Sequence, residues 1–349
     1  MSKLPRYGKI SKDFFDRVIY PNLGMRNAKI LVGPTLGVDT CVIRTGRNQV
    51  LVATTDPISF VPDIGPKQSA FESVGLIASD LATSGFSPQF ALFDFNLPLS
   101  MKSSDFKAYW KAVNRECKKL GISIIGGHTS RFEGLNSTVI GAGTMFSLGP
   151  EDSYLTSQNG RVGDKVLVTK GAAIATTAIL ASAFPNLLRK KIGRSNLAKS
   201  KAYVKRITTV KDSLVAAKAG ASALHDSTEG GVLSALYELA SASKTGMLVD
   251  ISSIPVSEET REICRAFKID PYTSLSEGSL VISCKSSKVK RVISALRSSG
   301  IKAAVVGELT PSRKGIIALD GKGKGFPVRY PVTDPYWQAY YGGKKSGWT

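Results

Sequence analysis

The first 150 residues alternate between short apolar runs and longer amphipathic segments. Runs rich in β-branched and aromatic residues predict strands over residues 40–44, 50–55, 90–93, 122–125 and 138–148. The strand at 50–55 is expected to end abruptly at Asp56-Pro57. Apolar residues recur at helical spacing over residues 69–84, where Gly85 ends the pattern, and over residues 104–120. This half of the chain is therefore expected to alternate strands and helices.

A second αβ pattern begins after residues 148–161, a stretch made almost wholly of turn formers. Strands are predicted over residues 165–169, 247–251, 280–284, 302–307 and 315–319, and helices over 210–219, 257–267 and 289–298. The basic segment 184–200, which contains Pro185 and Gly193, interrupts the pattern. We expect two domains, residues 1–155 and 156–349, which agrees with the size at which single cores stop growing.

Composition indicates an ordinary globular protein. Apolar residues make up 42% of the 349 residues and the mean hydropathy is near zero. The sequence contains neither a run of 18 apolar residues nor a signal-peptide pattern, so we expect no membrane association and a cytoplasmic location. Four cysteines lie far apart without a CxxC pair, which favours reduced thiols over a zinc site or disulfides.

The net charge of +20 is the one extreme value. It is compatible with nucleic acid, with phosphorylated small molecules or with a lysine-rich proteome. The basic residues are spread along the chain without an RNA-binding signature, so nucleic-acid binding is not favoured. P-loop, GxGxxG, HExxH and GxSxG patterns are also missing, which removes the commonest nucleotide-binding and hydrolase motifs.

Three aspartates lie at element boundaries or on the polar side of a predicted helix: Asp39, Asp56 and Asp80. Carboxylates so placed can hold Mg²⁺ while substrate phosphates complete its coordination. The plainer interpretation is that Asp39 and Asp56 form turns at strand ends and that Asp80 faces solvent. A glycine-rich turn containing Gly37 precedes Asp39 and could bring backbone amides close to a phosphate, or could be only a tight turn.

Two further stretches carry candidate chemistry. The predicted strand 122–125 opens onto Gly126, Gly127, His128 and Thr129, which would allow the backbone to approach a ligand. A polar loop from His225 leads through Gly230 and Gly231 into a helix whose first amides could bind an anion. Its members Asp226, Thr228 and Glu229 could contact metal or phosphate, or could cap the helix. Glu277, directly before a buried strand, is either a functional carboxylate or a solvated loop residue.

Taken together, these blocks resemble the aminoimidazole ribonucleotide synthetase superfamily, which includes selenophosphate synthetase, thiamine-monophosphate kinase and the hydrogenase maturation factor HypE. The resemblance rests on TTDPISFVPDIG, ASDLATSGFSP, GGHT, HDSTEGG followed by a helix and IPV, and LSEGSLVI, in that order. The blocks span residues 33–307, and their spacing is most similar to that of HypE.

The resemblance implies a two-domain α/β (α+β) fold whose N-terminal domains pair into a dimeric sheet or barrel, with ATP and Mg²⁺ near that interface. It assigns metal binding to Asp39, Asp56 and Asp80, and nucleotide binding to Gly37, Asp39, Asp56, Gly126, Gly127, Thr129, Asp226, Thr228, Gly230 and Gly231. We assign catalytic roles to Asp80, His128 and Glu277.

The departures from the family pattern concern the acceptor chemistry. HypE proteins end in a cysteine that carries a carbamoyl group, whereas this chain ends Ser-Gly-Trp-Thr, so we expect it not to form a thiocyanate on itself. Ser130 replaces a lysine expected after the paired glycines. We expect an ATP-dependent, Mg²⁺-dependent homodimeric enzyme acting on an unidentified acceptor. The alternative is a non-catalytic, HypE-like maturation or scaffold protein that binds nucleotide and a protein partner.

Overall fold

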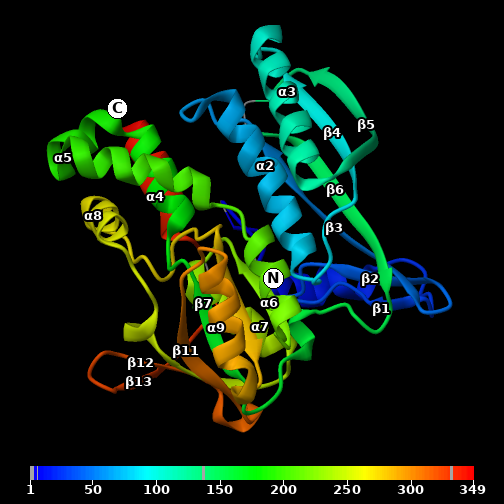
Figure 1. Ribbon diagram of the computed structural model, residues 1–349. Coiled ribbons are helices and arrows are strands. Elements are labelled where there is room, and N and C mark those ends of the chain that lie inside the picture. Colours follow the sequence, from blue (N-terminus) through cyan, green and yellow to red (C-terminus); the bar gives the residue numbers. More distant parts are fainter. Residues whose placement is uncertain (1–3, 6, 136–137, 331–332) are drawn as a thin grey trace.

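The computed structural model describes residues 4–5, 7–135, 138–330 and 333–349. The chain forms two β-sheets with separate cores, and the sequence-predicted two-part α/β architecture is confirmed (Figure 1). The N-terminal sheet has the order β1-β2-β3-β6-β4-β5 and is open, with β1 and β5 at its edges. Its strands are β1 (Ile30–Val32), β2 (Cys41–Gly46), β3 (Gln49–Ser59), β4 (Phe90–Pro98), β5 (Ser123–Phe132) and β6 (Val139–Pro150).

One face of the N-terminal sheet is covered by α2 (Gly65–Ala82) and α3 (Ser103–Leu120), which pack side by side (Figure 1). Side chains alternate between faces along a strand, and in β3 the positions Val50, Val52 and Ile58 are buried in this core. The prediction that this strand stops at Asp56-Pro57 is wrong. The strand continues to Ser59, and Asp56 pairs with Gly143 of β6.

The C-terminal sheet has the order β13-β12-β9-β11-β7-β10-β8 and is covered on both faces. Its strands are β7 (Lys165–Thr169), β8 (Ala223–Ser227), β9 (Gly246–Asp250), β10 (Ser279–Cys284), β11 (Ala303–Thr310), β12 (Ile316–Leu319) and β13 (Gly325–Pro327). In β7, Val166 and Val168 share a core with α7 (Gly231–Ala242), whereas Leu167 packs in the core of α6 (Val210–Ala219) and α9 (Val289–Ser298). Burial on both faces explains why these strands are almost wholly apolar.

A further core is built mainly from helices: α4 (Ile174–Ala183), α5 (Pro185–Lys201), α8 (Glu258–Phe267) and α10 (Pro335–Lys345). Phe184 lies at its centre, with Phe267, Tyr340 and Trp348 around it. The prediction that segment 184–200 interrupts regular structure is therefore wrong. Proline is tolerated in a first helical turn, and Gly193 supplies a kink within a segment that is otherwise helical.

The two halves meet where α2 packs on the start of α6. Ser79 Oγ of α2 accepts a hydrogen bond from the backbone N–H of Thr209 at 2.9 Å, and both residues are buried. The N-terminal segment, with the short helix α1 (Lys12–Phe14), also lies at this junction (Figure 1). Within the described residues, no helix is both long enough and apolar enough to span a membrane.

Candidate functional site

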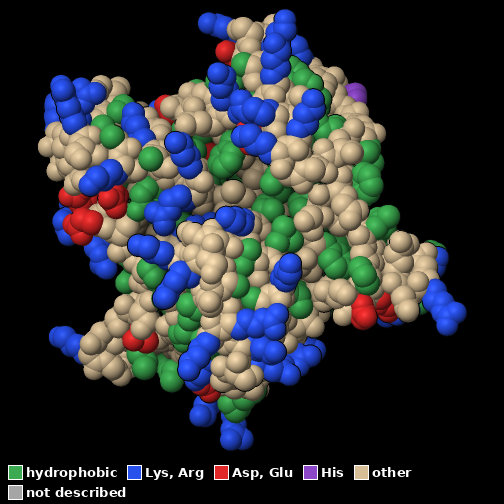
Figure 2. Space-filling model, in the orientation of Figure 1, with side chains coloured by type: hydrophobic (Ala, Val, Ile, Leu, Met, Phe, Trp, Pro, Cys, Tyr) green, Lys and Arg blue, Asp and Glu red, His purple; other side chains and the backbone are tan. Residues whose placement is uncertain are grey.

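A cavity of about 810 Å³ lies between the two halves of the chain. This volume is within the range of roughly 300–1,000 Å³ that is usual for ligand pockets. Eight carboxyl side chains line it: Asp39, Asp56, Glu72, Asp80, Asp226, Glu229, Glu238 and Glu277. Lys9 and Lys12 are the lysines among its described lining residues. Lysines and arginines are meanwhile spread over both halves of the outer face in Figure 2, so an acidic cavity lies inside a basic protein.

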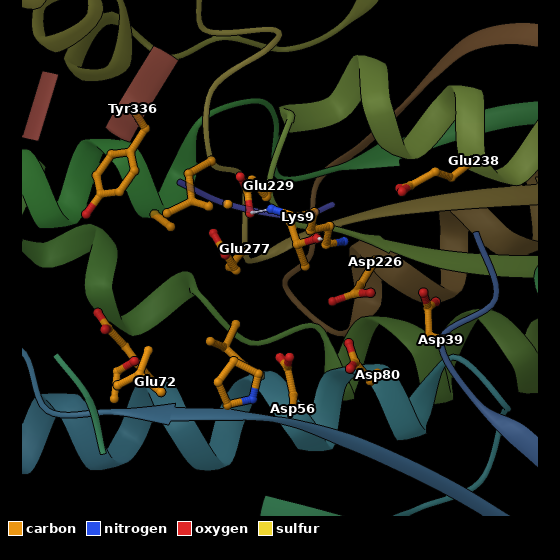
Figure 3. A pocket seen from close by; sticks show the side chains of 18 of the residues that line it. Lys9, Asp39, Asp56, Glu72, Asp80, Asp226, Glu229, Glu238, Glu277 and Tyr336 are labelled. Atoms are coloured by element: carbon orange, nitrogen blue, oxygen red, sulfur yellow. Dashed lines mark hydrogen bonds between the residues drawn. The ribbon is translucent and has the colours of Figure 1, made fainter. Parts of the chain in front are cut away.

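Helix α2 carries three of the lining side chains at intervals of four residues: Glu72, Leu76 and Asp80. Residues four apart lie on one face of an α-helix, so all three point to the same side. In Figure 3, Glu72 and Asp80 stand at different ends of the cavity, with Asp56 of β3 between them. The alternative in which Asp80 faces solvent is therefore wrong, because Asp80 lines the cavity.

Four aspartates gather at the end of the cavity near β8: Asp39, Asp56, Asp80 and Asp226 (Figure 3). Burial, followed by repulsion from Asp226, Asp56 and Asp39, raises the pKa of Asp80 well above its usual range. Burial and the charge of Asp39 likewise raise the pKa of Asp226 to about 7. Burial raises the pKa of Asp56 to about 6, and the charge of Asp39 adds to this. Acids that repel one another in this way are stabilised by a cation among them.

The donor set suits a hard divalent cation. Ligand atoms of Asp39, His225 and Asp226 lie within 4.8 Å of one another. Carboxylate oxygens are the protein ligands that Mg²⁺ prefers, and Mg²⁺ usually takes only one or two of them together with substrate phosphates. Asp39 and Asp226 therefore suit Mg²⁺, and Asp56 and Asp80, which were predicted as metal ligands together with Asp39, line the same cavity.

His225 belongs to a hydrogen-bonded chain behind the aspartates. Its Nδ1 lies 2.9 Å from Asp39 Oδ2 and its Nε2 lies 2.9 Å from Glu238 Oε2. Tyr330 donates to the other oxygen of Glu238 at 3.0 Å. Burial alone would lower the pKa of His225, but the charges and hydrogen bonds of Asp39 and Glu238 raise it well above its usual range. His225 therefore favours the protonated form and holds the Asp39 carboxylate in place.

Lys9 is a site residue that sequence reasoning missed. The N-terminal segment carries it into the cavity, where its backbone N–H donates to Glu229 Oε2 at 3.1 Å and its Nζ donates to Thr228 Oγ1 at 3.1 Å (Figure 3). The surrounding protein opposes its charge, but Glu238 and Asp226 raise the pKa of its ammonium above its usual value. The sequence placed this lysine in a basic arm, and no local pattern indicates that the arm folds back between the two halves.

The opposite end of the cavity is formed by Glu72, Glu277 and aromatic side chains of α10. Tyr336, Trp337, Tyr340 and Tyr341 of that helix all line the cavity. Figure 3 shows Tyr336 at this end together with Glu72, and Glu277 toward the middle. Glu277, assigned a catalytic role from the sequence, therefore does line the cavity, whereas no sequence pattern singles out Glu72 or the tyrosines.

The predicted anion site at the start of α7 is already occupied by protein groups. The Gly230 N–H donates to Asp334 Oδ2 at 2.7 Å, and the Gly231 N–H donates to the Thr228 carbonyl oxygen at 3.2 Å. Thr228 and Asp226 line the cavity, but Gly230 and Gly231 do not. At Gly37, by contrast, the glycine is required by a positive φ of +76° and by an approach that would place a Cβ 2.5 Å from the Glu238 carbonyl oxygen.

Gly126, Gly127, His128 and Thr129 lie elsewhere. The predicted loop is wrong, because all four belong to β5, the exposed edge strand of the N-terminal sheet, and none lines the cavity. Gly127 permits the close pairing of β5 with β4, since a Cβ there would lie 2.0 Å from the Phe93 carbonyl oxygen. His128 Nε2 lies 2.5 Å from Ser130 Oγ, and both residues are far from the aspartates in the fold.

Two α/β halves around an acidic cavity define a class of two-domain proteins, and the comparisons identify it. Residues 37–147 match the family described as "AIR synthase related protein, N-terminal domain". Residues 161–320 match the family described as "AIR synthase related protein, C-terminal domain". The chain belongs to the AIR synthase related family.

Within this family, the chain is similar to proteins named for hydrogenase maturation. A putative hydrogenase expression/formation protein of Methanocaldococcus jannaschii is 25% identical over 335 residues, which covers 94% of this chain and 96% of that protein. Carbamoyl dehydratase HypE of Escherichia coli K12 is 27% identical over 280 residues, covering 76% and 80%. The resemblance predicted from the sequence is confirmed.

Solved structures show the same fold at lower sequence identity. A structure of hydrogenase maturation protein HypE in complex with ATP has a TM-score of 0.67 at 18% identity and covers 93% of each chain. AaThiL complexed with AMPPCP and TMP has a TM-score of 0.65 at 18% identity, covering 84% of this chain and 89% of that one.

Proposed function

We propose that this protein is a Mg²⁺-dependent enzyme that uses ATP to phosphorylate or otherwise activate an acceptor. The convergence of Asp39, Asp56, Asp80 and Asp226 on one cavity carries the proposal, because a cation stabilises such a cluster and Mg²⁺ accompanies nucleotide phosphates. The ATP complex of HypE and the AMPPCP complex of AaThiL, which share the fold, support nucleotide as the ligand.

The chain's own residues have separable roles in this scheme. The four aspartates would hold Mg²⁺, which when bound neutralises charge on the phosphates. Asp80 is oriented by Thr54, whose hydroxyl lies 3.4 Å from Asp80 Oδ2 and 2.8 Å from the Asp39 carbonyl oxygen. His225 holds Asp39, and Lys9 offers an ammonium donor at the cavity wall. We assign nucleotide binding and dimerisation to residues 1–155 and closure over the nucleotide to residues 156–349.

A homodimer formed through the N-terminal sheets would give β5 a place in the site. Ile125 and Phe132 of β5 and Leu92 of β4 are 54%, 48% and 38% exposed, which is unusual for large apolar side chains in a sheet. An edge strand with unpaired backbone groups is also a natural pairing surface. In such a dimer, Gly126, Gly127, His128 and Thr129 would lie at the interface, and the roles predicted for them would be exerted there.

The second candidate is a non-catalytic protein that binds nucleotide and a protein partner. The position of His128 outside the cavity favours it, because a predicted catalytic group is then missing from the acid cluster. A solved HypE–HypF complex, with a TM-score of 0.66 at 20% identity, offers a precedent for a protein partner. Release of ADP or phosphate in the presence of candidate acceptors separates this candidate from the enzyme.

Thermal unfolding with ATP tests nucleotide binding. We expect ATP to stabilise the protein only when Mg²⁺ is present, by about 2.7 kcal/mol at a hundredfold excess over Kd. Asp80→Asn should lose this stabilisation, whereas Asp152→Asn, which alters an exposed carboxylate outside the cavity, should retain it. Equal stabilisation with and without Mg²⁺ would contradict the proposal.

A further inference from the structure

Some carboxyl groups of the cavity have protein partners, whereas two of them carry a buried oxygen that has none among the described residues. Glu229 accepts hydrogen bonds from Lys9 and from Trp337 Nε1, and Glu238 accepts from Tyr330 and contacts His225. Glu72 Oε1 and Glu277 Oε2, in contrast, are buried atoms without a hydrogen-bond partner among the described residues. Buried polar atoms are nearly always paired in proteins, so an unpaired one in a cavity wall indicates a ligand that is absent.

Glu72 lies at the end of the cavity away from the aspartates, and Glu277 lies between that end and the aspartates, toward the middle (Figure 3). Glu72 is only 8% exposed, and its neighbours on the cavity wall are apolar or aromatic: Leu76, Ala175, Ile179, Leu275, Tyr336 and Tyr340. Burial raises the pKa of Glu277 well above its usual range, and the charges of Asp334, Asp226 and Glu72 add to this. Burial also raises the pKa of Tyr336, with Tyr340, Glu72 and Glu277 adding to it. This part of the cavity therefore combines two acids with a wall that is otherwise suited to an apolar or flat group.

We propose that this end of the cavity, formed by Glu72, Glu277, Tyr336 and Tyr340, binds the acceptor, and that the acceptor is an organic cation: an amine or amidine attached to an apolar group. The assignment as an acceptor site rests on the proposed function, since nucleotide and Mg²⁺ would occupy the aspartate end. An anionic acceptor is disfavoured by the two acids. A cation can pair with both unpaired oxygens.

Binding of such a cation should be accompanied by release of a proton from the protein. Burial raises the pKa of Glu72 to about 8, so the empty pocket holds this carboxyl mostly protonated near neutral pH. When the cation binds, Glu72 releases its proton to solvent and the carboxylate pairs with the ligand nitrogen. A neutral ligand would leave the proton in place. We therefore expect close to one proton to be released for each cation bound at about pH 7.

The test uses three flat probes of nearly one shape on the full-length protein: benzamidine, which is cationic, benzamide, which is neutral, and benzoate, which is anionic. Ligand-observed NMR should show benzamidine binding at least about tenfold more tightly than benzamide, and benzoate not binding. Calorimetry in two buffers of different ionisation enthalpy should show the proton release. Glu72→Gln should reduce the preference to about twofold and reduce the proton release.

Two comparison variants keep the result interpretable. Glu277→Gln makes the same change at the second carboxyl and should also reduce the preference, and it serves in place of Glu72→Gln if that variant does not fold. Glu308→Gln, on β11 and outside the cavity lining, should behave as wild type. Equal affinity for benzamidine and benzamide, no saturable benzamidine binding, or a preference unchanged in both pocket variants would overturn the inference.

Binding of a fluorescent ATP analogue with Mg²⁺, measured on the same samples, separates this inference from the proposed function. If benzamidine binds as expected but the nucleotide does not, the cation pocket stands and the ATP-dependent function fails. If nucleotide binds in wild type and in Glu72→Gln but benzamidine shows no charge preference, the function stands and the cationic acceptor is wrong.

Discussion

Replacing Glu72 by glutamine should stabilise the empty protein, and increasingly so as the pH rises. The pKa of Glu72 is raised by burial from 4.5 to about 8. Between these two values the folded protein holds a proton that the unfolded chain has released, so the stability of the wild type falls as pH rises through this window. Each unit of pKa difference corresponds to about 1.4 kcal/mol. From about pH 5 to about pH 8 the loss due to Glu72 is therefore on the order of 3 kcal/mol.

Glutamine has nearly the same shape and does not ionise, so the variant escapes this loss. Urea unfolding of wild type and Glu72→Gln at several pH values isolates the contribution of Glu72, because the aspartates titrate in both proteins. We expect a free energy difference near zero at about pH 5 that grows to on the order of 3 kcal/mol in favour of the variant at about pH 8. Glu308→Gln should show no such trend. A difference that is independent of pH, or that favours the wild type at high pH, would show that Glu72 is not a desolvated, unpartnered acid.

Three further predictions concern the acid cluster and the dimer. Lys9→Met should bind Mg²⁺ more tightly in the absence of nucleotide, because an ammonium among the carboxylates competes with the metal; calorimetry that shows equal or weaker binding would contradict this. His225→Gln should destabilise the protein by about 3 kcal/mol in urea unfolding near neutral pH, because Glu238 and Asp39 lose a buried cationic partner. A loss of stability below about 1 kcal/mol would show that these ion pairs are unimportant. Sedimentation should show a dimer of 37.2 kDa chains that Ile125→Asp dissociates, and a wild-type monomer at micromolar concentration would rule the dimer out.

The sequence predicted most elements of the fold because their signals are local. The helix predicted over residues 210–219 is α6 (Val210–Ala219), and the strand predicted over 165–169 is β7 (Lys165–Thr169). Failures occurred where tertiary context overrides a local rule. Pro57 lies within β3, although proline usually marks the end of a strand. Pro185 begins a helix in a segment whose composition indicates an interruption.

The sequence predicted those parts of the candidate site whose residues stand out in short local motifs. Asp39, Asp56 and Asp80 were found because aspartates at element boundaries are conspicuous, and the structure brings them to one cavity. Glu72 and Lys9 were missed for opposite reasons. Glu72 is an ordinary polar residue in an amphipathic helix until the second half of the chain covers it, and Lys9 depends on the path of a segment with little regular structure.

Helix α2 fixes the spacing between two acidic side chains of the cavity. Glu72 and Asp80 are eight residues apart on a single unbroken helix, and at 1.5 Å per residue their backbones are separated by about 12 Å along its axis. In the proposed scheme, this helix would set the distance between metal-bound phosphates at one end and the acceptor's charged group at the other. Because each residue turns the helix by about 100°, inserting one alanine between the two acids would swing one of them out of the cavity while leaving both in the chain. In the proposed scheme, the spacing of Glu72 and Asp80 along α2 therefore determines how long the acceptor must be.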